Sequence, residues 1–97
     1  MYQLTTHASF DSAHFLAGYQ GKCSNLHGHR WKLEVTVSSE KLEEEGQIRG
    51  MVVDFGELKK DVKDLADEFD HCLIIETGSL KEKTMEALAE EDFRIIQ

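Results

Sequence analysis

Proline is absent from this chain of 97 residues, and cysteine occurs only twice, as Cys23 and Cys72. Two cysteines allow at most one disulfide, which excludes a small secreted scaffold built on several disulfides. Residues 1–7 have neither the basic start nor the apolar stretch of a signal peptide. We therefore expect two reduced thiols, each of which is a possible metal ligand or reactive group.

Long apolar runs are also missing, because no stretch approaches the roughly 20 residues of a membrane span. Basic residues are few: 11 lysines and arginines stand against 19 aspartates and glutamates, which gives a formal net charge of −8. Polyanions bind to basic surfaces, so this balance argues against nucleic acid as a partner. We expect a soluble cytoplasmic protein with no membrane partner, and the charge stays compatible with a small anionic substrate.

The remaining composition is that of a globular protein, with 40% hydrophobic and 31% charged residues. A chain of this length forms one domain, residues 1–97, and has no room for two independent cores. Such a small domain is marginally stable alone, so a metal ion, a partner subunit or both would stabilise it.

Alternation of apolar and polar residues predicts two half-buried strands. In residues 2–10 the apolar side chains lie mostly at even positions, and in residues 31–38 they lie at odd positions. Short apolar stretches at 51–53 and 93–96 predict a third strand and the beginning of a fourth. The glycine-containing segments 17–26 and 39–50 are typical of loops.

Two helices complete the pattern. Apolar residues at steps of three and four from Phe55 to Phe69 predict an amphipathic helix, with Asp54 as its N-cap. Ser79 with Glu82 repeats the capping signal before a second, weaker helix. This order predicts an α+β fold, an antiparallel sheet with both helices packed on one face. So few strands leave open sheet edges, which indicates strand pairing between subunits or further sequence.

Three histidines have a spacing that favours a metal site. His27 and His29 lie two residues apart in an extended segment, so both side chains project from one face. His14 continues the inward parity of the first strand, whereas His7 has the opposite parity and is expected to be exposed. Three imidazoles around one zinc ion leave a fourth position open, as in catalytic sites. A His-x-His pair is also common on protein surfaces, so this pattern alone does not establish a site.

Cysteine and an Asp-His pair are further candidates for chemistry. Cys23 lies four residues before His27, and a nearby metal and Lys22 would favour its thiolate as a base or nucleophile. On local grounds alone a passive loop cysteine is the favoured interpretation. Asp70 and His71 follow the first helix and form either a proton-relay pair or a histidine that favourably ends a helix. Cys72 lies in an apolar stretch and is expected to be buried and inert.

Four motifs occur in order over residues 1–75. They are Phe10-Asp11-Ser12-Ala13-His14, Cys23-Ser24-Asn25-Leu26-His27-Gly28-His29, Gly50-Met51-Val52-Val53-Asp54-Phe55 and Phe69-Asp70-His71. Together they resemble the 6-pyruvoyltetrahydropterin synthase superfamily. The Cys-x-x-x-His-Gly-His spacing is most similar to the bacterial branch, the 6-carboxytetrahydropterin synthases of queuosine biosynthesis.

The resemblance implies a fold, a site and a reaction. His14, His27 and His29 would bind Zn²⁺, and the catalytic residues would be Cys23, Asp70 and His71. The enzyme would be a carbon–carbon lyase that converts dihydroneopterin triphosphate to 6-carboxytetrahydropterin, with release of acetaldehyde and triphosphate. The fold would be the tunnelling fold, in which subunits of a homo-oligomer close their sheets into a barrel with active sites at the interfaces.

The resemblance ends before the family's Pro-Thr-x-Glu-Asn helix, its last two strands and the late glutamate that anchors the pterin ring. We therefore expect a pterin-synthase-like domain that is incomplete at its C-terminus. Three other functions stay open at this point: the sister 6-pyruvoyltetrahydropterin synthase activity, a non-catalytic zinc or pterin binder, and a structural oligomerisation module.

Overall fold

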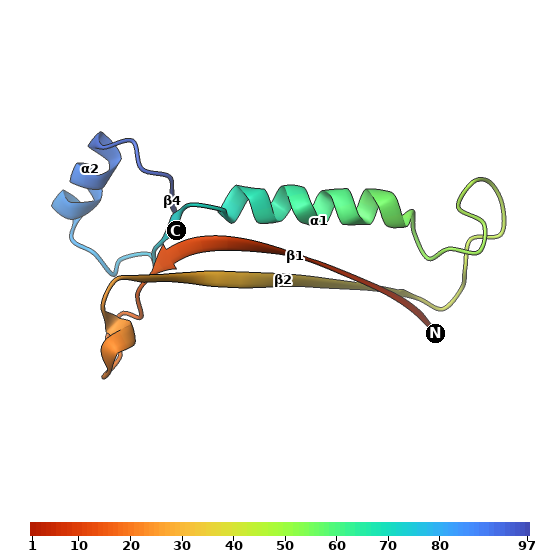
Figure 1. Ribbon diagram of the computed structural model, residues 1–97, viewed down its shortest axis with the longest axis horizontal. Coiled ribbons are helices and arrows are strands. Elements are labelled where there is room, and N and C mark those ends of the chain that lie inside the picture. The colour runs from red at the N-terminus through yellow and green to blue at the C-terminus, as the bar shows by residue number, and fades with distance from the viewer. The chain divides into compact units, whose positions relative to one another are not determined.

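The computed structural model describes residues 1–97, and its elements confirm the α+β class (Figure 1). In chain order they are β1 (Tyr2–His14), the short 3-10 helix η1 (Lys22–Ser24), β2 (His27–Ser39), α1 (Phe55–Phe69), β3 (Leu73–Ile74), α2 (Glu82–Glu90) and β4 (Ile95–Ile96). The four strands form one open sheet in the order β2-β1-β3-β4. Neither helix has the length and apolar character needed to cross a membrane.

The chain divides into two compact units. The first contains Met1–Ser9 and Lys32–Glu68, and the second contains Phe10–Trp31 and Phe69–Gln97. The strands β1 and β2 and the helix α1 each contribute residues to both units. The candidate site residues all belong to the second unit.

The first unit confirms the predicted alternation and the predicted helix cap. Even residues of β1 and odd residues of β2 are the less exposed ones, as a sheet with one covered face requires. The hydroxyls of Thr5 and Thr36 lie 2.8 Å apart across the two strands. At the start of α1 the Glu57 N–H donates to the Asp54 carboxylate over 3.1 Å, which satisfies one of the free N–H groups of the first turn.

The third strand predicted at residues 51–53 is wrong. These residues belong to a loop, in which the Met51 N–H donates to the Ile48 carbonyl and the Met51 carbonyl accepts from the Glu43 N–H, both over 2.9 Å. Gly50 adopts a φ of 83°, which turns the chain just before the apolar stretch. Three apolar residues carry no periodicity that distinguishes a strand from a loop, so the interpretation had little support.

The second unit makes the sheet mixed, which corrects the predicted antiparallel sheet. The short strand β3 pairs in parallel with β1, where Ala13 faces Leu73, and β4 pairs in parallel with β3. The chain passes through a helix before each of these strands, α1 before β3 and α2 before β4. A helical crossover returns the chain in the same direction, and parallel pairing follows. The predicted last strand is confirmed at Ile95–Ile96.

The second helix is confirmed, but its predicted cap is wrong. The N-cap position is held by Lys81, and no side chain bonds to the first turn. The Ser79 hydroxyl is buried without a hydrogen-bond partner. The helix begins at Glu82, so the serine lies too far upstream to reach the N–H groups that a cap must satisfy. The packing of both helices on one face of the sheet stays a prediction.

Candidate metal centre

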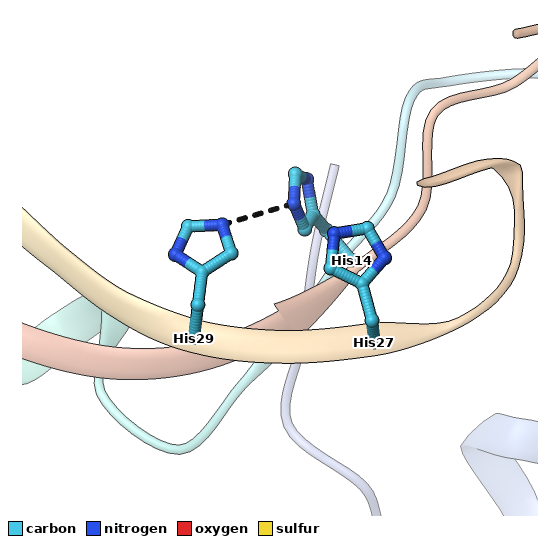
Figure 2. A group of neighbouring side chains, drawn as sticks. All are labelled: His14, His27 and His29. Atoms are coloured by element: carbon cyan, nitrogen blue, oxygen red, sulfur yellow. Dashed lines mark hydrogen bonds between the residues drawn. The ribbon is translucent and has the colours of Figure 1, made fainter. Parts of the chain in front are cut away.

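The structure brings the three predicted histidines together. His14 is the last residue of β1, and His27 and His29 lie at the start of β2. These two strand ends are adjacent, since Gly28 lies next to the Ser12 carbonyl and Ala13. The ring centroid of His14 lies 4.6 Å from that of His27 and 5.0 Å from that of His29. One nitrogen from each ring lies within 4.8 Å of the other two (Figure 2).

Hydrogen bonds fix which nitrogen of two rings faces the centre. The Nδ1 of His27 donates to the Asn25 carbonyl over 2.8 Å, and the Nδ1 of His29 donates to the Arg30 carbonyl over 3.0 Å. A carbonyl only accepts, so in neutral rings both protons lie on Nδ1 and both Nε2 atoms keep a lone pair. Ligating histidines commonly have such a second partner, which sets the tautomer and orients the ring.

The donor set fits a divalent cation. The Nε2 atoms of His14 and His29 lie 3.1 Å apart (Figure 2). Nitrogens bound at 2.0–2.1 Å to a tetrahedral zinc ion lie about 3.4 Å from one another. Small rotations of the rings therefore suffice to place three nitrogens around one ion. Three protein ligands leave one of the four positions open to a substrate oxygen.

Burial lowers the pKa of His14, and the neighbouring His27 and His29 lower it further. Burial disfavours the charged ring, and a positive charge on either neighbour repels a second one. Both effects favour the neutral imidazole, which is the form that binds a metal.

Competition between zinc and protons gives a pH dependence that calorimetry can measure. A protonated imidazole cannot bind a metal, so we expect the affinity for zinc to fall as the pH decreases from 8 to 5. Because the pKa of His14 is lowered, protons displace zinc from this ring only at a lower pH. A titration with zinc that gives the same affinity at pH 5 and pH 8 would contradict histidine ligation.

A cluster of aromatic rings, which was not predicted from the sequence, lies beside the histidines. The ring of Trp31 lies 4.8 Å from His14 and 4.3 Å from His29, and its indole N–H donates to the Ser12 carbonyl over 3.3 Å. Phe10 stacks on Trp31 at 5.9 Å and also contacts Phe69. Trp31 therefore packs against two of the histidines, and Phe10 packs against Trp31. The inward parity of Trp31 indicated a core residue but did not indicate this role.

The predicted Asp70–His71 pair forms. The His71 Nδ1 donates to the Asp70 carboxylate over 2.8 Å, and the second oxygen of that carboxylate accepts the Asp11 N–H over 2.9 Å. The bond from the Asp11 backbone, and then that from His71, lower the pKa of Asp70, so the carboxylate stays charged at neutral pH. The His71 side chain is 78% exposed, which leaves its Nε2 accessible.

The Asp70–His71 pair lies near the metal centre. The pair follows α1 and is held against β1, where the His71 N–H donates to the Asp11 carbonyl over 2.7 Å. His71 and His29 line the same shallow depression of the surface, together with residues of β1 and β2. The candidate proton carrier His71 and the candidate metal ligand His29 therefore face one open space.

The structure gives less support for the predicted role of Cys23. It lies half-buried in η1, and its carbonyl accepts the Leu16 N–H over 2.9 Å, which ties this turn to the chain just after β1. No disulfide joins it to Cys72, which is buried as predicted. No hydrogen bond joins its thiol to the histidines or to the Asp70–His71 pair, so its role stays a prediction.

The fold and the three histidines define a class: a small α+β protein with a histidine centre where two strands meet. Residues 3–97 match the sequence profile of the 6-pyruvoyl tetrahydropterin synthase family. The chain belongs to this family.

Relatives and one solved structure agree with this assignment. The 6-carboxy-5,6,7,8-tetrahydropterin synthase of Haemophilus influenzae is 39% identical over 92 residues, which cover 94% of this chain and 64% of that protein. The Rickettsia bellii protein of the same name is 44% identical over 79 residues, covering 80% and 54%. An uncharacterized protein of Wolinella succinogenes has a TM-score of 0.71 at 25% identity, covering 93% and 53%. The chain thus spans between half and two thirds of the lengths of these proteins.

Proposed function

We propose that this protein is a zinc-dependent 6-carboxytetrahydropterin synthase. It converts dihydroneopterin triphosphate and one water molecule to 6-carboxytetrahydropterin, acetaldehyde and triphosphate. The observation that carries the proposal is the convergence of three imidazoles, two with their tautomers set by backbone carbonyls. Relatives that bear this enzyme's name at about 40% identity support the choice of substrate.

Each site residue has a role in this reaction. His14, His27 and His29 would hold the zinc ion, which when bound polarises the side-chain hydroxyls of the substrate. Cys23 would take a proton from one face of the substrate as a thiolate. His71 would deliver or remove a proton through Nε2, because its Nδ1 is engaged by the Asp70 carboxylate. Loss of acetaldehyde breaks a carbon–carbon bond, which makes the enzyme a lyase.

The proposal includes the oligomeric state of the protein and its location in the cell. The sheet ends at β2 and β4, and β2 offers a 13-residue edge whose outer backbone groups have no partner strand. Long open edges favour pairing with another chain. A homo-oligomer that pairs these edges into a barrel, with active sites at its interfaces, would act in the cytoplasm in queuosine biosynthesis.

Two alternatives have specific support. The family's own description names 6-pyruvoyl tetrahydropterin synthase, which eliminates triphosphate from the same substrate. A non-catalytic zinc or pterin binder needs only the three histidines, which the structure brings together.

A product assay separates these functions. Zinc-loaded protein is incubated with dihydroneopterin triphosphate, and the pterin product and acetaldehyde are measured by mass spectrometry. We expect the carboxylated pterin and acetaldehyde in equal amounts. A pyruvoyl pterin without acetaldehyde would assign the sister activity. Bound zinc with no turnover would contradict the enzyme proposal and leave a binding protein.

A further inference from the structure

Ser12, like Thr6, is a buried polar residue at an inward position of β1. It is only 6% exposed. Its hydroxyl makes two hydrogen bonds: it donates to the Phe69 carbonyl, and it accepts the Cys72 N–H over 3.1 Å. Both the donor and the acceptor capacity of a buried hydroxyl are thus used.

The two partners of this hydroxyl flank the Asp70–His71 pair. Phe69 immediately precedes the pair and Cys72 immediately follows it, so one side chain binds the backbone at both ends of a two-residue turn. His71 adopts a φ of 55°, in the left-handed region. A residue other than glycine stays in this region when its surroundings fix it, because the conformation is otherwise unfavourable.

Ser12 also lies two residues before His14 on the same strand. The Cys72 carbonyl accepts the Ala13 N–H over 3.0 Å, so the turn continues directly into the strand pairing beside His14. Ser12 is therefore one of the side chains that hold this turn against the strand carrying the first histidine. The Asp70 carboxylate, which accepts the Asp11 N–H, and Arg94, which donates to the Asp70 carbonyl, are the others.

We propose that Ser12 is a positioning residue for His71. Its hydroxyl holds the Phe69–Cys72 turn against β1, so that the His71 imidazole stands at a set distance from the histidine centre. This inference rests on the proposed function for its effect on turnover. It makes a separate prediction about the turn itself, which requires no activity.

Kinetics of three variants test the effect on turnover. Ser12→Ala removes the hydroxyl and with it the hydrogen bonds to the Phe69 carbonyl and from the Cys72 N–H. We expect bound zinc and KM to be unchanged and kcat to fall by about 10- to 100-fold, since small misplacements of catalytic groups have effects of this size. Ser12→Thr keeps a hydroxyl and should restore most of kcat. Thr6→Val, which removes another buried β1 hydroxyl outside the site, should leave kcat near the wild-type value.

Amide hydrogen exchange tests the turn independently. In Ser12→Ala the Cys72 amide should exchange faster, while the Leu73 and Ile75 amides, bonded to the Arg94 and Ile96 carbonyls, keep their protection. Faster exchange at all three amides, or loss of zinc, would overturn the proposal, because Ser12 would then support the fold as a whole. Wild-type kcat in Ser12→Ala would overturn it as well. If the wild-type protein turns over nothing, the proposed function fails, and the exchange pattern alone decides the role of Ser12.

Discussion

His27→Ala is expected to reduce the bound zinc from about one ion per chain to almost none, because a pair of imidazoles cannot replace a three-ligand site. Turnover should fall with it. Stabilisation of developing charge by a metal is worth several kcal/mol, and about 4 kcal/mol corresponds to a 1,000-fold loss of rate. Metal analysis after gel filtration measures the first effect, and acetaldehyde release measures the second.

His7→Ala is the matched control for this variant. His7 lies on β1 like His14 but has the opposite parity, and the structure confirms that it is exposed. This variant should keep its zinc and its turnover. If His27→Ala retained a full complement of zinc, or if His7→Ala lost it, the three-histidine site would be contradicted.

Cys23→Ala is expected to keep its zinc and to lose turnover by about 100- to 10,000-fold, the range of a general acid or base. The thiol would be the group that moves a proton on one face of the substrate, and alanine cannot replace it. Turnover and bound zinc are measured in the same preparation, so that a catalytic loss is distinguished from a loss of metal.

The control for Cys23→Ala is Ser24→Ala in the same turn. The Ser24 hydroxyl donates to the Gly21 carbonyl over 2.8 Å, so its removal disturbs η1 without touching the thiol. Turnover should stay near the wild-type value. Wild-type turnover in Cys23→Ala would make Cys23 a passive loop residue. Loss of zinc in Cys23→Ala would make it a fourth ligand that closes the site.

The sequence was sufficient to predict the long elements and the positions of the histidines. Two alternating strands have one register that buries their apolar faces. The same alternation predicted that His14, His27 and His29 lie close together. Apolar steps of three and four likewise located α1.

The short elements could not be predicted in the same way. The strand β3 was missed because neighbouring strands supply its hydrogen bonds, and nothing within two residues reveals such pairing. The strand β4 was predicted only as the apolar stretch 93–96, of which Ile95 and Ile96 pair with β3. The stretch at 51–53 is entirely apolar, yet it pairs with no strand. Tertiary context decided these cases over local propensity.

Two residues that contact the site residues, Trp31 and Ser12, were also not predicted. Trp31 and Ser12 act through contacts with residues far along the chain, Trp31 on His14 and Ser12 on the turn after α1. One signal was available for Ser12: a polar residue at an inward position requires a buried partner. The sequence does not say which partner that is.

The central claim is that one divalent ion binds to three imidazole nitrogens and keeps a position open. Anomalous X-ray diffraction from crystals of the zinc-loaded protein, collected on both sides of the zinc absorption edge, tests it most directly. We expect one peak per chain, about 2.0–2.1 Å from a nitrogen of each of His14, His27 and His29, with no fourth protein ligand. The absence of a peak at the three rings, or a peak bound also by the Cys23 sulfur, would contradict it.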